Sequence, residues 1–227
     1  NGIEALAVAE REDIDIVLAD IMMPEMDGLE LLEHFRKELA TSHIPFLILS
    51  ARHDTETRLL GLTLAADDFL TKPFIPQELQ LKLRNVAKSR ALLRQAVIRE
   101  MSLGDVSSEP VISTQEHLSV TDHQFLKRLE SWIAQHFSDE SLTVSKMAEG
   151  LAVNERTLQR KIAALIDLTP NQFINRYRLS KAREELERAE FTIQQIAFEC
   201  GFKSQQSFAR AFKAHFGITP SEMRQRR

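Results

Sequence analysis

The sequence has a single cysteine, Cys200, among 227 residues, so no disulfide can form within the chain. It has no apolar run near the roughly 20 residues that a membrane span needs, and its first residues lack a secretion-signal pattern. HExxH, paired Cys/His spacing and glycine-rich nucleotide loops are also missing. These absences argue against a disulfide scaffold, a membrane contact by this segment, and the common zinc and nucleotide sites. They predict a cytoplasmic protein in which Cys200 is a buried packing thiol beside Ile196.

Charge is divided unevenly along the chain, although the total is only −4. Residues 121–227 carry 17 Lys and Arg against 13 Asp and Glu, a net charge of +4, which leaves −8 for residues 1–120. A mildly basic second half suits contact with phosphates, whereas an acidic first half does not. The length predicts two domains, and the second is the candidate for nucleic-acid binding.

The first hundred residues alternate short β-prone runs with amphipathic stretches, which is the pattern of a parallel sheet covered by helices. Strands are predicted at 14–19, 44–49 and 68–71. Helices are predicted through Leu29, Leu32, Phe35 and Leu39, behind Asp54 and Thr55 through Leu59, Leu62 and Leu64, and from Pro76 to about Glu100. Residues 101–120 lose this periodicity and gain Ser, Gly and Pro, so they are predicted to be a linker between an α/β domain, 1–100, and an all-α domain, 121–227.

Two segments of the second half, about 143–166 and 192–216, repeat one plan. Each has a threonine cap, a short apolar helix, a break with glycine, a new Asn or Ser cap and a second helix, which predicts two helix-turn-helix units. The second helices share an outward face of long polar side chains: Arg156, Gln159 and Arg160, then Gln205, Gln206 and Arg210. Arg matches the paired acceptors of guanine, and Gln matches adenine. A solvated face would look similar, but the same stripe after the same turn twice favours double-stranded DNA.

A helix is predicted between the two units, from Pro170 to about Ala189. Some twenty residues at about 1.5 Å each span about 30 Å. Successive major-groove segments on one face of DNA lie about 34 Å apart. We therefore expect a single chain to contact a double site.

The second half resembles AraC/XylS-type regulators over essentially all of residues 121–227. The resemblance is carried by Ile196-Ala197, Gly201-Phe202, Ser204, Phe208, Arg210, Phe212-Lys213, Gly217, Thr219-Pro220-Ser221 and Arg224. It supports the base-contacting roles given above to the two polar stripes. The sequence departs from the family at Asp167, where a glycine is frequent in the first unit.

Three polar residues of the first half, Asp20, Ser50 and Lys72, stand at the ends of the predicted strands, so they should meet at the carboxyl edge of the sheet. The stretches NGIEAL, DIMMPEMDG, LILSA and AADDFLTKPF, in this order, resemble a two-component receiver domain with a flavodoxin-like fold.

The receiver resemblance implies a role for each of these residues. Asp20 would take a phosphoryl group from the phosphohistidine of a histidine kinase or phosphotransfer protein. Lys72 would bind a phosphoryl oxygen, Ser50 would hydrogen-bond it, and Phe69 would be the aromatic side chain that turns inward. Mg²⁺ would be held by Asp20, the Met22 carbonyl and water, with the remaining acidic ligands absent from this chain.

Receiver domains begin with a strand, a helix and a second strand before the NGIEAL-like stretch, and this sequence opens at that stretch. We expect the sequence to be a piece whose front lies upstream. Phosphorylation is then expected of the intact protein rather than of this piece alone.

Together these patterns predict a DNA-binding response regulator, not an enzyme, in which phosphorylation of Asp20 controls transcription. Two alternatives stay open. The chain could be the receiver and DNA-binding end of a hybrid sensor histidine kinase, in which case the whole protein would be an enzyme attached to the membrane. It could also be a phosphate-independent regulator, although Asp20, Ser50 and Lys72 argue against that. The sequence leaves open whether the chain forms a homodimer.

Overall fold

The computed structural model describes residues 1–51, 61, 63–102, 118–188 and 190–225. These residues form two compact units, one containing Asn1–Val97 and the other containing Leu126–Arg227. The helix predicted behind Asp54 and Thr55 lies almost wholly outside the described residues.

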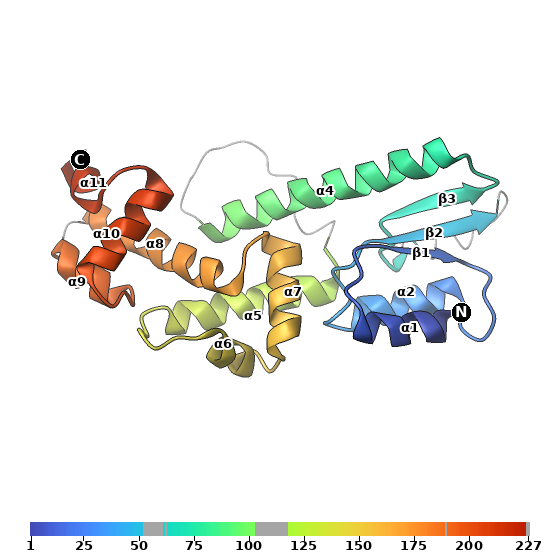
Figure 1. The fold of residues 1–227 in the computed structure, drawn as a ribbon, viewed down its shortest axis with the longest axis horizontal. Coiled ribbons are helices and arrows are strands. Elements are labelled where there is room, and N and C mark those ends of the chain that lie inside the picture. The colour runs from blue at the N-terminus through green and yellow to red at the C-terminus, as the bar shows by residue number, and fades with distance from the viewer. Residues whose placement is uncertain (52–60, 62, 103–117, 189, 226–227) are drawn as a thin grey trace. The chain divides into compact units, whose positions relative to one another are not determined.

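The first unit is α/β, as predicted. Its elements are α1 (Gly2–Arg11), β1 (Val17–Asp20), α2 (Gly28–Lys37), β2 (Phe46–Ala51), β3 (Asp68–Lys72) and α4 (Pro76–Ser102), whose last residues extend beyond the unit. The three strands form a parallel sheet in the order β1-β2-β3 (Figure 1). Helix α4 begins at Pro76, as predicted, and ends two residues beyond the expected Glu100.

The core of the first unit lies between the sheet and its helices. Phe46, Ile48 and Leu70 are fully buried because parallel strands carry helices on their faces and are apolar on both sides. Leu32 and Phe35 of the predicted helical stripe on α2 are buried in the same core. Helices α1 and α2 lie side by side next to the sheet (Figure 1).

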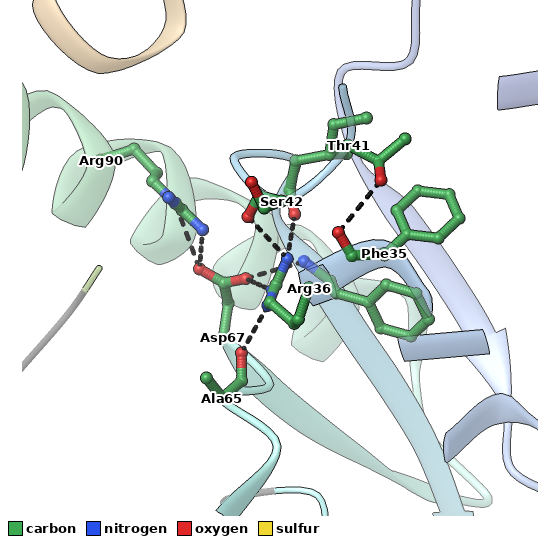
Figure 2. A network of polar contacts seen from close by, with 9 residues as sticks. Phe35, Arg36, Thr41, Ser42, Ala65, Asp67 and Arg90 are labelled. Carbon is green, nitrogen blue, oxygen red and sulfur yellow. Dashed lines mark hydrogen bonds and ion pairs between the residues drawn. The ribbon is translucent and has the colours of Figure 1, made fainter. Parts of the chain in front are cut away.

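A buried charge network holds two helices at the amino end of β3 (Figure 2). Arg36 of α2 donates to the Asp67 carboxylate at 2.8 Å, and Arg90 of α4 reaches the other oxygen of that carboxylate at 2.6 Å. Arg36 also donates to the main-chain carbonyls of Ser42, Ile44 and Ala65 at 2.9–3.1 Å. Burial lowers the pKa of Arg36, and the Asp67 charge opposes that shift. The carboxylate of Asp67 therefore joins α2 and α4 to the start of β3.

The second unit is helical throughout, as predicted. Its helices are α5 (Val120–His136), whose first residues precede the unit, α6 (Val144–Gly150), α7 (Glu155–Ile166), α8 (Pro170–Arg188), α9 (Ile193–Glu199), α10 (Gln205–Phe216) and α11 (Pro220–Gln225). Helices α6 and α7 form the first predicted helix-turn-helix unit, α9 and α10 form the second, and α8 connects them (Figure 1).

Cys200 lies in the core of the second helix-turn-helix unit, 2% exposed, with Ile196, Phe208 and Phe212 around it. Burial raises the pKa of the Cys200 thiol to about 12. The expected packing role is confirmed. In the part of the chain that the structure describes, no helix combines the length and apolarity needed to cross a membrane.

Candidate functional site

The register of the sheet brings the three predicted phosphoacceptor-site residues to one edge. Asp20 is the last residue of β1 and is paired with Leu49 of β2, one position before Ser50. Lys72 ends β3 and is paired with Ala51, one position after Ser50. Because all three strands are parallel, carboxylate, hydroxyl and ammonium groups lie at the same carboxyl edge, where α/β sheets place their ligand sites.

The Lys72 ammonium donates to the Asp20 carboxylate across this edge. The two side chains are 43% and 36% exposed, so the pair is accessible from solvent. Attack on phosphorus needs the carboxylate oxygen, and the product carries additional negative charge. An ammonium that contacts this carboxylate could balance such a charge as a point cation.

The Ser50 hydroxyl is buried, with 1% of the residue exposed, and its Oγ has no hydrogen-bond partner among the described residues. A buried hydroxyl without a partner costs about 1–3 kcal/mol. An acceptor oxygen arriving at this edge would recover that cost. Ser50 thus has a buried hydroxyl that is able to donate a hydrogen bond to an acceptor oxygen at this edge.

Phe69 lies on β3, three residues before Lys72, and its ring points into the core, 6% exposed. A Cβ on Gly61 would lie 2.7 Å from the ring, so the ring fills the space beside that glycine. Phe69 is therefore buried in this structure, and its role as the aromatic side chain that turns inward when the hydroxyl moves stays a prediction.

The loop after Asp20 is held by a close main-chain contact. Gly28 donates its N–H to the Ile21 carbonyl at 3.0 Å, and a Cβ at Gly28 would lie 2.3 Å from the Asp20 carbonyl oxygen. Asp27 caps α2 in a capping box with Glu30. Only glycine permits this approach, which fixes the main chain that carries Asp20.

The receiver resemblance implies a magnesium site beside Asp20. By that resemblance Asp20 would supply a carboxylate, and Met22, a residue 87% exposed, would supply its main-chain carbonyl. Magnesium requires near-octahedral oxygen coordination and is normally held by one or two carboxylates with water. Among the described residues, no group of three or more His, Cys, Asp or Glu side chains is placed to hold a metal ion.

In both helix-turn-helix units, each helix starts at the capping residue that the sequence predicted. The cap side chains accept hydrogen bonds from main-chain N–H groups three residues on: Thr143 from Lys146, Asn154 from Thr157, Thr192 from Gln195 and Ser204 from Ser207, at 2.7–3.2 Å. These bonds satisfy N–H groups that would otherwise lack partners at each helix start. They fix where α7 and α10 begin.

The second helices of the two units are divided into an inner and an outer face, as predicted. Leu158 and Ile162 of α7, and Phe208 and Phe212 of α10, are fully buried. The predicted base-contacting residues lie on the other face: Arg156, Gln159, Gln205, Gln206 and Arg210 are exposed, and Arg160 is partly exposed. Two similar polar helix faces in a domain of positive charge can contact base edges in a major groove.

Asp167 stands where the family frequently has glycine, and α7 still ends there in a left-handed conformation. Asp167 adopts the left-handed conformation, with φ 60°, and its N–H donates to the Ala163 carbonyl. Gly217 takes the corresponding position after α10 with φ 76° and donates to Lys213. Asp is one of the few residues other than glycine that visit this conformation.

Two family models match separate parts of the chain. The response regulator receiver domain matches residues 1–84, and the helix-turn-helix domain matches residues 147–226. The chain is therefore a receiver domain joined to an AraC-type helix-turn-helix domain.

The chain is similar to several proteins of known name. The chain is 32% identical over 179 residues to the transcriptional regulatory protein CpxR homolog of Haemophilus influenzae, covering 73% of this chain and 74% of that protein. It is 31% identical over 226 residues to histidine kinase P4 of Formosa agariphila, covering 100% of this chain and 16% of the kinase. A solved structure, the C-terminal domain of AraT, a response regulator from Geobacillus stearothermophilus, is 32% identical with a TM-score of 0.43, over 45% of this chain and 85% of that one. The chain belongs to the response-regulator family of two-component systems.

Two buried arginines were not singled out from the sequence. Arg36 anchors the Asp67 network, and Arg178 of α8, 8% exposed, bonds to two main-chain carbonyls. Each lies four residues after an inward apolar residue, Leu32 and Ile174 respectively. An arginine on the apolar stripe of a helix was the signal that could have found them.

Proposed function

We propose that this chain is the regulated, DNA-binding part of a response regulator, in which Asp20 accepts a phosphoryl group and α7 and α10 contact base edges. The observation that carries the proposal is the repeated second helix. Each has a fully buried apolar face and an exposed face of Arg and Gln, after the same capped turn.

DNA recognition follows from the chemistry of those faces. Arg156 and Arg210 can each donate two hydrogen bonds to the O6 and N7 of a guanine, while Gln206 matches the donor and acceptor of adenine. Helix α8 has 19 residues, so it is about 28 Å long. That length suits two major-groove segments about 34 Å apart on one duplex face. One chain then contacts both halves of a double site.

The phosphoryl chemistry uses the sheet edge. A carboxylate oxygen of Asp20 attacks the phosphorus of a phosphohistidine on a kinase or phosphotransfer protein, the P–N bond breaks, and the imidazole leaves. Lys72 transfers its hydrogen bond from the carboxylate to a phosphoryl oxygen, and the Ser50 hydroxyl donates to another. The phosphoryl group brings nearly two negative charges, enough to rearrange the edge around Lys72. The altered edge then changes the equilibrium between two receiver states.

Phosphate-affinity electrophoresis of the full-length protein after incubation with acetyl phosphate tests the acceptor. We expect a slower band that Asp20→Asn abolishes. Asp27→Asn is the matched control, since Asp27 is a neighbouring carboxylate whose cap an asparagine can also make. A phosphorylated band that persists in Asp20→Asn would refute the assignment of Asp20.

Selection of binding sites from a random duplex pool, followed by footprinting, tests the DNA contacts. Arg156→Ala should weaken one protected segment and Arg210→Ala the other, each by about 1–3 kcal/mol on the selected site. Gln135→Ala, an exposed change on α5, should leave both segments protected. Losses of equal size on selected and random duplexes would contradict base contact by these arginines.

A second candidate function is the output end of a hybrid sensor histidine kinase. It is favoured by the match to histidine kinase P4, which covers 100% of this chain. In such a protein the phosphodonor would be a histidine of the same polypeptide. Autophosphorylation of the full-length protein with ATP, followed by transfer to Asp20, would establish it, and a full-length product without an ATP-binding core would exclude it.

A further inference from the structure

Arg178 binds the turn that follows α5. Its Nε donates to the Phe137 carbonyl at 2.8 Å and its Nη2 donates to the Asp139 carbonyl at 2.7 Å. The side chain is buried, and burial lowers the pKa of its guanidinium. Residues 137–141 form a turn, called the 137–141 turn below. Two buried, charge-assisted hydrogen bonds attach it to the middle of the connecting helix α8.

The second helix-turn-helix unit touches the same place. Gly201 lies in its turn, between α9 and α10, with φ +76°. A Cβ there would lie 2.4 Å from the Phe137 carbonyl oxygen and 2.9 Å from Nε of Arg178. The Phe137 ring packs against the core of this unit and lies 5.6 Å from the Tyr177 ring. Glycine is required here both for its conformation and for the close approach.

The first helix-turn-helix unit reaches the 137–141 turn from the other side. Lys146 of α6 forms an ion pair with Asp139 at 3.3 Å and donates to the Ser141 hydroxyl at 2.6 Å. Hydrogen bonds from Ser141, with smaller contributions from the hydrogen bond and the charge of Lys146, lower the pKa of Asp139 to about 2. Nearby, Trp132 of α5 lies directly against Gly150, at the end of α6. Contacts from both units therefore converge on one turn.

We propose that Arg178 is a positioning residue for DNA recognition, which fixes the spacing between the two helix-turn-helix units through the 137–141 turn. The inference rests on the proposed DNA-binding function. If α8 were the sole connection, the two helix-turn-helix units could rotate or bend relative to each other about that helix. Arg178 adds a second connection through α5, so that α7 and α10 are held as one rigid pair. The chain should then accept one separation of half-sites and reject others.

Binding of the full chain to a series of duplexes tests the proposal. The duplexes carry the two selected half-sites at the natural spacing, with one or two base pairs inserted, or with one half-site scrambled. The unmutated chain should lose at least about tenfold in affinity for one inserted base pair, since insertion both displaces and rotates the second half-site. Arg178→Gln should bind the natural spacing more weakly and lose less than about threefold on insertion. Arg178→Lys, which keeps the charge and one bond, should be intermediate.

Arg188→Gln is the matched control, because Arg188 lies on the same helix, is 62% exposed and pairs only with nearby Glu185 among the contacts described. It should keep the full dependence on spacing. Parallel spacing profiles for Arg178→Gln, Arg178→Lys and the unmutated chain would overturn the proposal, as would an unmutated chain that tolerates insertion. If the unmutated chain bound no sequence specifically, the proposed function itself would fail, and this inference with it.

Discussion

Arg36 and Asp67 form an ion pair of 2.8 Å at the amino end of β3, at the opposite end of the strand from Lys72 and the phosphoacceptor edge. Their side chains are only 9% and 17% exposed. The pair is therefore a structural part of the receiver, which stabilises the position of α4 through Arg90.

Asp67→Asn should lower the stability of the first unit by about 3–5 kcal/mol, because it leaves the buried Arg36 charge without its partner. Hydrogen exchange of the β2 and β3 amides measures this loss locally. Glu33→Gln on the same helix is the control, because its pair with Lys37 is exposed to solvent and contributes little to stability. Similar effects from both changes would show that burial of the Arg36 pair is unimportant.

Two glycines with the same backbone conformation should differ in how they tolerate alanine. Gly217 has φ +76° with no atom within 4 Å of an added Cβ, so Gly217→Ala should cost about 1–2 kcal/mol from conformation alone. Gly201 has the same φ, and an added Cβ would also collide with the Phe137 carbonyl. Gly201→Ala should therefore unfold at a clearly lower temperature than Gly217→Ala. Equal melting temperatures would mean that the contact with Phe137 is not close in solution.

The Cys200 thiol should resist alkylation in the folded protein. With its pKa raised to about 12 by burial, the thiolate is about 10⁻⁴ of the population near pH 8, against about a quarter for an unperturbed cysteine. Because the raised pKa keeps the Cys200 thiol protonated, its rate of alkylation should stay low until the solution is strongly alkaline. Mass spectrometry after iodoacetamide treatment should show at least about a thousandfold slower labelling than in a denaturing concentration of urea. Labelling within tenfold of the urea rate would contradict the buried position.

Local chemistry made the helix starts predictable. Thr143, Asn154, Thr192 and Ser204 were expected as caps because each side chain acts on main-chain groups only three residues away, and the structure confirms them. The three strands form where the sequence predicted strands, but their first or last residues differ from the predicted ones. β2 was expected at 44–49 but begins at Phe46, because Pro45 has no N–H to donate to a ladder and Phe46 is the residue that pairs with Val17.

Long-range contacts were not encoded in any short pattern. The acceptors of Arg178 are main-chain carbonyls 39 and 41 residues away, and every residue type carries such a carbonyl. The position of Asp67 beside Arg36, 31 residues apart, depends likewise on how α2 packs against the sheet. The meeting of Asp20 and Lys72 was predictable because parallel strands bring their carboxyl ends to one edge.

The most direct test of regulation by Asp20 is the affinity of the full-length protein for its selected DNA site, measured with and without phosphodonor. Coupling between two sites in one protein is typically worth 1–3 kcal/mol, so phosphorylation should change the dissociation constant by about 5- to 150-fold. Asp20→Asn should bind with one affinity under both conditions. An unchanged affinity of the unmutated protein, with phosphorylation of Asp20 verified in the same sample, would contradict the account.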